Sequence, residues 1–135
     1  MKYAIDSNLL ISATFKLHTP PALVLAAWRM RKIEWISCAE QTEELGMALF
    51  RPSVVARSLG GLPLAYSLVK EMQMACGHKI LTYPLPKVCR DPNDDFLFAL
   101  FDQGHVDAII SGDKDVLALK GRYPVLTPRE LIDRL

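Results

Sequence analysis

The stretch VDAIISGDKD, residues 106–115, is the part of this chain that decides its fold. Its first half is apolar apart from Asp107, and its second half holds a glycine and two acids. This is the pattern of a strand buried in a parallel sheet and followed by a turn. We predict a strand over 106–111, a turn at Gly112 and Asp113, and a short helix over 114–120. Strand, turn and helix in this order form the repeating unit of an α/β protein.

The N-terminal residues contain the same unit. KYAI at 2–5 reads as a short strand, and DSN at 6–8 follows it as a turn. Asp, Ser and Asn are good N-caps, so a helix over 9–13 is expected directly after the turn. The two segments are therefore strand-to-helix units of one kind.

The segments between these two units continue the alternation. We predict helices over 22–30, 39–50, 64–76 and 94–103, strands over 33–37 and 124–126, and a strand or extended linker over 79–86, whereas 54–61 is ambiguous. A last helix begins at Thr127-Pro128, where Thr127 and Glu130 have the spacing of a capping box. Alternating strands and helices predict an α/β fold with a mainly parallel sheet.

The composition is that of a folded domain. The chain has 135 residues and half of them are apolar, which is enough for a substantial core and argues against disorder. Sixteen basic residues stand against fifteen acidic ones, for a formal net charge of +1. A protein that coats nucleic acid would have a basic excess, but an enzyme that binds it transiently needs none. We expect a single domain over 1–135.

Cysteine and histidine offer no metal site. Cys38, Cys76 and Cys89 are odd in number and lack CxxC spacing, which is typical of reduced, buried thiols. The three histidines form no HxH or HExxH pattern. Asp6 interrupts the N-terminal apolar segment, which argues against a signal peptide, and no apolar run reaches the roughly eighteen residues of a membrane span. We expect a cytoplasmic protein without a membrane segment.

Acidic side chains recur at four places where a strand should end or a helix begin. They are Asp6; Glu43 and Glu44; Asp91, Asp94 and Asp95; and Asp113 and Asp115. Taken singly, each has an ordinary explanation as a helix cap, a turn residue or part of a solvated helix face. Together they suggest a site, because the carboxyl ends of parallel strands meet at one edge of a sheet. Ser7 and Asn8 either orient these acids through hydrogen bonds or simply cap the first helix.

Carboxylates that converge in this way repel one another unless cations lie between them. Mg²⁺ and Mn²⁺ prefer carboxylate and water oxygens and need neither histidine nor cysteine. Two such ions can activate a water molecule and stabilise charge on the leaving oxygen during phosphodiester hydrolysis. The sequence therefore indicates a metal-dependent hydrolase, with nucleic acid as the leading substrate.

Three motifs in this order and spacing resemble the PIN-domain ribonucleases over nearly the whole chain. They are AIDSNLLISA near the start, ELGMALFRP in the middle, and RDPNDDFLFAL followed by DAIISGDKDVLAL near the end. The similarity is greatest to VapC-like toxin components of type II toxin–antitoxin pairs. The resemblance implies a three-layer α/β sandwich, with a mainly parallel central sheet flanked by helices. It also implies a metal-dependent endoribonuclease that leaves a 5′-phosphate and a 3′-hydroxyl.

The four acids of this family fall on Asp6, Glu44, Asp94 and Asp113. The resemblance implies that Asp6, Asp94 and Asp113 hold Mg²⁺ or Mn²⁺. Glu44 is then a further ligand or the base that orients water. The auxiliary residues are Ser7, Asn8, Asp91, Asp95 and Asp115, with Ser7 in place of the family's commoner threonine.

The implied partners are an RNA substrate, a cognate antitoxin protein and a second copy of the chain in a homodimer. Residues that could hold RNA are Arg51, Arg90, Lys114 and Lys120, each of which is otherwise ordinary charged surface. Apolar residues such as Trp28, Met30 and Trp35 permit a docking surface, although core packing explains most of them.

Two other functions compete with this interpretation. The first is a catalytically inactive PIN-like module that binds RNA or protein, against which the presence of all four acids argues. The second is another acid-based α/β protein. A haloacid dehalogenase-type phosphatase needs an aspartate two residues after its nucleophile, where this chain has Asn8, and a phosphoacceptor receiver domain needs paired acids after its first strand.

Overall fold

The computed structural model describes residues 1–135 and has a five-stranded sheet at its centre. The strands lie in the order β3-β2-β1-β4-β5, and every neighbouring pair is parallel. They are β1 (Lys2–Ile5), β2 (Glu34–Ser37), β3 (Gly77–His78), β4 (Ala108–Ile110) and β5 (Val125–Leu126). The predicted parallel α/β sheet is therefore confirmed.

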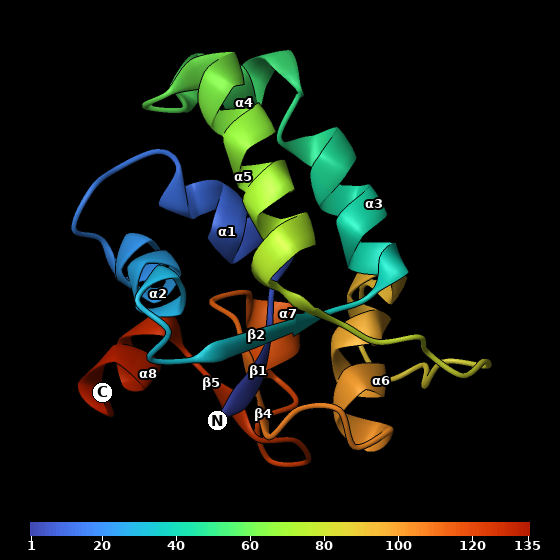
Figure 1. Ribbon diagram of the computed structural model, residues 1–135. Coiled ribbons are helices and arrows are strands. Elements are labelled where there is room, and N and C mark those ends of the chain that lie inside the picture. The colour runs from blue at the N-terminus through green and yellow to red at the C-terminus, as the bar shows by residue number, and fades with distance from the viewer.

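Helices flank the sheet, and α3, α4 and α5 rise together beyond one end of it, at the top of Figure 1. In chain order the helices are α1 (Ser7–Ala13), α2 (Pro20–Arg29), α3 (Ala39–Ala48), α4 (Pro52–Arg57), α5 (Gly61–Ala75), the 3₁₀ turn η1 (Pro92–Asp94), α6 (Asp95–Asp102), α7 (Lys114–Leu117) and α8 (Pro128–Asp133). No helix has both the length and the apolar character that crossing a bilayer would demand.

Each face of the sheet carries its own hydrophobic core, because successive side chains of a strand point to opposite faces. Tyr3 and Ile5 of β1 belong to a cluster of 21 buried residues, whereas Ala4 between them belongs to a second cluster of 15. Trp28 and Trp35 lie in the first cluster with their rings edge to face, 5.0 Å between centroids. Core packing thus accounts for both tryptophans, and of the three apolar residues named above only Met30 is exposed.

The starts of α1 and α8 follow the predicted capping signals, and α2 begins with a cap of the same kind. The Asp6 side chain accepts a hydrogen bond from the backbone of Asn8 at the start of α1, and Thr19 caps α2 ahead of its two prolines. Thr127 and Glu130 form the complete capping box at α8.

The structure resolves two segments for which the sequence left alternatives open. The ambiguous residues 54–61 lie partly in α4, which starts at Pro52, the favoured first position of a helix. The extended segment 79–86 is not a strand, and the edge strand β3 lies just before it. Two prolines at 84 and 86 cannot donate to a ladder, and Thr82 instead bonds through its backbone with the side chain of Gln103.

The three cysteines are free and buried, as expected of structural thiols. Burial raises the pKa of Cys38 to about 12, so this thiol stays protonated and unreactive at neutral pH. Cys76 donates a hydrogen bond of 3.1 Å to the backbone oxygen of Trp35.

The strand order places a topological switch point between β1 and β4. From β1 the chain moves to β2 and then β3 on one side, and it returns to β4 and β5 on the other. Crevices at the carboxyl ends of the two strands that flank such a point are the usual ligand sites of open α/β sheets. In this chain the residues that follow those two strands are Asp6 and Ser111.

Candidate active site

Asp6 is fixed at the carboxyl end of β1 by three hydrogen bonds. Its backbone N–H donates to the carbonyl of Ile110 over 2.9 Å. Its Oδ1 accepts from the backbone N–H of Asn8 (3.0 Å), and its Oδ2 accepts from the hydroxyl of Ser111 (2.6 Å). With 2% of its surface exposed, Asp6 is a buried carboxylate in one set orientation.

Ser111 links Asp6 to the acid that follows β4. The Ser111 Oγ accepts a hydrogen bond from the backbone N–H of Asp113 (3.0 Å) while its hydroxyl donates to Asp6. Asp113 caps α7, because its Oδ1 accepts from the backbone N–H of Asp115 (2.9 Å). Two of the predicted site acids thus lie on neighbouring strand ends, joined through one buried serine.

The third acidic cluster divides between two roles. Asp91 caps η1 by accepting from the backbone N–H of Asn93 (3.0 Å), and Asp94 follows as a buried residue at the end of this turn. Asp95 is also buried, but its Oδ1 accepts from the backbone N–H of Cys89 (3.0 Å). Asp95 therefore anchors the loop that leads into η1.

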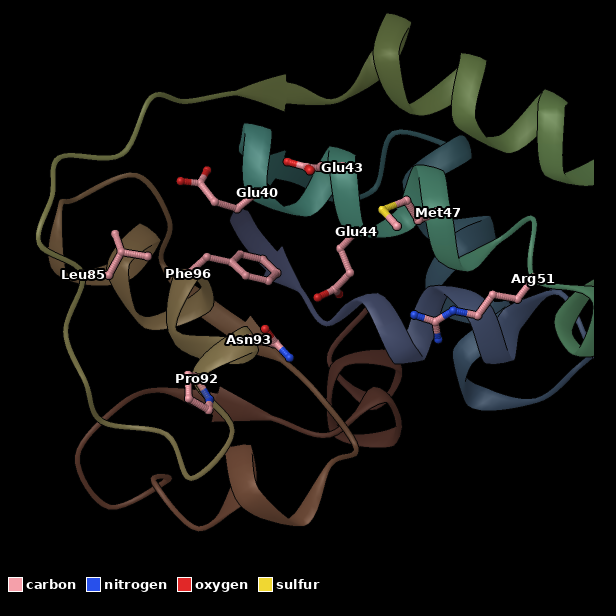
Figure 2. A pocket seen from close by; sticks show the side chains of 9 residues that line it. All are labelled: Glu40, Glu43, Glu44, Met47, Arg51, Leu85, Pro92, Asn93 and Phe96. Atoms are coloured by element: carbon pink, nitrogen blue, oxygen red, sulfur yellow. The ribbon is translucent and has the colours of Figure 1, made fainter.

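Glu44 approaches the same place from α3. It is half-buried, and the nearby Ser7 hydroxyl opposes the rise of its pKa that burial causes. Ser7 itself is buried next to Asp6. The exposed neighbour Glu43 points away from Glu44 in the close view (Figure 2).

Five of these carboxyl groups influence one another electrostatically. Burial, and then the charges of Asp6, Asp91, Asp113 and Glu44, raise the pKa of Asp94 from 3.8 to about 7. Burial also raises the pKa of Asp6 against the opposing hydrogen bonds of Ser111 and Asn8, with Asp113 and Asp91 adding to the increase. The pKa of Glu44 is raised by burial and by the nearby Asp6. The acids from four distant segments therefore share one region of the molecule.

These acids lie near one another, but they do not form a complete set of metal ligands. No three His, Cys, Asp or Glu side chains are grouped so that they could hold a metal ion between them, contrary to the expectation of a ready cluster. The physical reason is that like charges repel and that Asp6, Asp91 and Asp113 direct oxygens to capping hydrogen bonds. The donor chemistry still suits Mg²⁺, which retains several waters and is often bound by only one or two carboxylates.

Gln41 is a residue that the sequence analysis missed. It is fully buried on α3, and its amide donates to the carbonyl of Ile5 and to the Ser7 hydroxyl (3.3 Å). Its carbonyl accepts from the Trp35 indole (3.2 Å) and the Ser37 hydroxyl (2.7 Å). Gln41 so ties α3 to the ends of β1 and β2. Its spacing could have indicated that it is buried, since Gln41 shares one helix face with the apolar residues Leu45 and Ala48.

Two clefts open beside the acids. The first, which we call the α3–η1 cleft, has a volume of about 380 Å³, and its lining includes Glu44, Met47, Arg51, Pro92, Asn93 and Phe96 (Figure 2). The second, of about 310 Å³, is lined by Asp6, Asn8, Ser12 and Asp113 among others. The site is thus accessible from two sides, with Glu44 on one and Asp6 and Asp113 on the other.

Comparison with known proteins agrees with this architecture. The family model described as PIN domain matches residues 2–115, and the chain belongs to the PIN domain family. The matched part contains all four acids, while β5, which extends the same sheet, and the helix α8 lie beyond it. No curated protein and no solved structure matched the chain. PIN domains are generally nucleases that use divalent metal ions.

Proposed function

We propose that this protein is a metal-dependent endoribonuclease that hydrolyses RNA phosphodiester bonds at the carboxyl edge of its sheet. The observation that carries the proposal is the hydrogen-bonded chain from Asp6 through Ser111 to Asp113 on neighbouring strand ends. Asp94 is buried near these residues, and burial and the neighbouring acids raise its pKa to about 7. Perturbed acids in an accessible cleft are typical of functional sites. Membership of the PIN domain family supports a nuclease in particular.

Asp6, Asp94 and Asp113 would hold Mg²⁺ or Mn²⁺, with Glu44 as a further ligand or as the group that orients water. Bound there, the ion would polarise a phosphoryl oxygen, lower the pKa of water and offset the negative charge of the acids. The ready change of Asp94 between neutral and ionised forms fits this role, since a cation favours the ionised form.

The chain's own residues have defined tasks in this scheme. Ser111 and the backbone of Asn8 hold the Asp6 carboxylate in one orientation, which a ligand or a water-binding group requires. Glu44 carries its carboxylate toward the α3–η1 cleft, where it can accept a proton from attacking water. Hydrolysis places the water oxygen on phosphorus and leaves a 5′-phosphate and a 3′-hydroxyl.

We further infer, from the motif resemblance, that the enzyme is the toxin of a toxin–antitoxin pair and acts in the cytoplasm as one domain over 1–135. A cognate antitoxin would then cover the acidic edge, and a second copy would form a homodimer. Exposed apolar side chains on and near α3 to α5, namely Met47, Leu59, Leu62 and Tyr66, support the presence of a protein partner. Induced expression should arrest growth, and the Asp6→Asn variant should not.

The central experiment is cleavage of a labelled RNA pool by purified protein with Mg²⁺ or Mn²⁺. Parallel reactions contain EDTA or the Asp6→Asn variant. Cleavage that disappears in both controls supports the proposal and excludes a contaminating nuclease. Cleavage that persists in the Asp6→Asn variant refutes the assignment of the site.

The absence of a closed ligand set favours one alternative, a PIN-like module that binds RNA or protein without catalysis. Titration with Mn²⁺ in a calorimeter separates the two functions. The nuclease requires binding that is lost in Asp6→Asn and Asp94→Asn, whereas a non-catalytic module has no need of it.

A further inference from the structure

Arg51 stands at the outer end of the α3–η1 cleft without a partner. The structure pairs Arg29 with Glu71 and Lys120 with Glu130, and it has no further salt bridge. The Arg51 side chain is exposed, provides no cap to α4 and extends toward the middle of the cleft (Figure 2). It is close enough to Glu44 to oppose the rise of that group's pKa, which burial causes in the first place. A guanidinium without a salt-bridge partner, in the same cleft as Glu44, can bind a phosphate.

The remaining lining of the cleft suits a nucleobase. Asn93 is exposed on η1 and points its amide toward the space between Glu44 and Arg51 (Figure 2). Met47 on α3, which is 67% exposed, and Pro92 on η1 add apolar surface to the lining of the same cleft. An amide offers a base both a donor and an acceptor, and apolar side chains contact its flat faces.

Size and charge decide how a nucleotide would lie. A volume of about 380 Å³ is at the lower end for ligand pockets and admits one nucleotide-sized group. Glu40, Glu43 and Glu44 line the α3 side, so a phosphate would be repelled there and attracted to Arg51. The carboxylates can instead accept from the amino group of a base.

We propose that the α3–η1 cleft is a subsite for one unpaired nucleotide of a single-stranded RNA, with Arg51 on its phosphate and Asn93 on its base. This inference rests on the proposed ribonuclease function and deepens it by naming the residues that would hold the substrate beside the acids. A paired base cannot enter so small a cleft, because its edge and faces are occupied within the duplex. The subsite therefore selects single strands beside the acidic site.

Binding of a short fluorescein-labelled RNA, followed by fluorescence anisotropy in EDTA at several salt concentrations, tests the subsite apart from cleavage. The unchanged protein should bind the single strand more tightly than the matching duplex. Arg51→Ala should lower the slope of log K against log salt by about 0.7, the value of one phosphate contact on a single strand. Arg51→Lys keeps the charge and should keep the slope. Asn93→Ala should weaken binding by about two- to tenfold at an unchanged slope.

Arg122→Ala is the matched control, since Arg122 is exposed and lies before β5, at the opposite edge of the sheet. Equal slopes for Arg51→Ala and Arg122→Ala would overturn the subsite, as would equal affinity for single strand and duplex, or no binding of the single strand. Cleavage with an unchanged slope in Arg51→Ala rejects the subsite alone. Binding that depends on Arg51 without any metal-dependent cleavage rejects the nuclease function alone.

Discussion

The Ser111 hydroxyl donates a hydrogen bond of 2.6 Å to the carboxylate of Asp6, a residue 105 positions earlier in the chain. Because β1 and β4 are adjacent and parallel, these two residues leave the sheet side by side at its switch point. The same serine accepts from the backbone of Asp113. One buried hydroxyl therefore sets the relative positions of two acids that the proposed metal site requires.

Loss of Ser111 or Asp6 should reduce nuclease activity to different degrees. Ser111→Ala frees the Asp6 carboxylate to rotate, and removal of such an orienting partner costs about 10–100-fold in metal affinity or activity. Asp6→Asn removes the ligand itself and should cost on the order of 100-fold or more. Initial rates of cleavage of a labelled RNA, together with Mn²⁺ titration of both variants, test whether Asp6→Asn loses more activity and metal affinity than Ser111→Ala. A Ser111→Ala variant with undiminished Mn²⁺ affinity would contradict the positioning role.

The adjacent acids Asp94 and Asp95 should respond oppositely to isosteric substitution. A divalent ion that binds the folded protein stabilises it by about 2.7 kcal/mol when free ion is at about 100 times its Kd. Mn²⁺ should thus raise the melting temperature of the unchanged protein and of Asp95→Asn, whose side-chain oxygen can still accept from Cys89. The rise should vanish in Asp94→Asn. Thermal melts with Mn²⁺ and with EDTA provide the comparison, and an equal rise in both variants would exclude Asp94 as a ligand.

The raised pKa of Asp94, about 7 through burial and neighbouring acids, makes stability depend on pH. The folded state holds this proton more tightly than the unfolded state, whose pKa is near 3.8. The contribution of Asp94 to stability is therefore full below the unfolded pKa and is lost as the pH rises through about 7. Asp94→Asn stays neutral and should raise the free energy of unfolding at neutral pH by at least about 1.4 kcal/mol, the worth of one pKa unit.

Urea denaturation in EDTA across this pH range measures the effect. In the unchanged protein the free energy of unfolding should fall as the pH rises, and in Asp94→Asn the fall should be smaller. The residual slope comes from Asp6 and Glu44, whose pKa values burial also raises. Identical pH profiles for the two proteins would refute the perturbed state of Asp94.

Gln41→Ala should destabilise the fold by about 3 kcal/mol or more. The substitution leaves the Trp35 indole, the Ser37 hydroxyl and the Ile5 carbonyl without their buried partner, and each such group costs about 1–3 kcal/mol. Glu43→Ala, an exposed change on the same helix, is the control and should stay within about 0.5 kcal/mol. Urea denaturation compares the two, and equal values would show that the Gln41 network adds nothing to stability.

Local chemistry made much of the fold predictable. The strands at Lys2–Ile5 and Ala108–Ile110 and the capping box at Thr127 follow from apolar runs and capping residues, which act over a few neighbouring positions. Of the two alternatives for 79–86, a strand or an extended linker, the strand is absent. An edge strand as short as β3 has too few residues for a pattern to show.

The roles of the individual acids were harder to predict from the sequence. Asp94 and Asp95 are adjacent and chemically identical, yet one is near the other site acids and the other holds the backbone of Cys89. Side-chain direction at the junction of η1 and α6 separates them, and it depends on the packing of the whole loop. Gln41 looked like an ordinary polar helix residue because its four partners come from distant segments, namely β1, β2 and the first residue of α1.

The sequence by itself determined the alternation of strands and helices, the membership of the PIN domain family and the set of acids, because these depend on residue type and local spacing. Only the tertiary structure decided the order β3-β2-β1-β4-β5, and with it the neighbourhood of Asp6, Ser111 and Asp113. Strand order is a competition among non-local pairings whose free energies depend on both cores at once. The burial and mutual repulsion that raise the pKa of Asp94 likewise arise only when four distant segments meet.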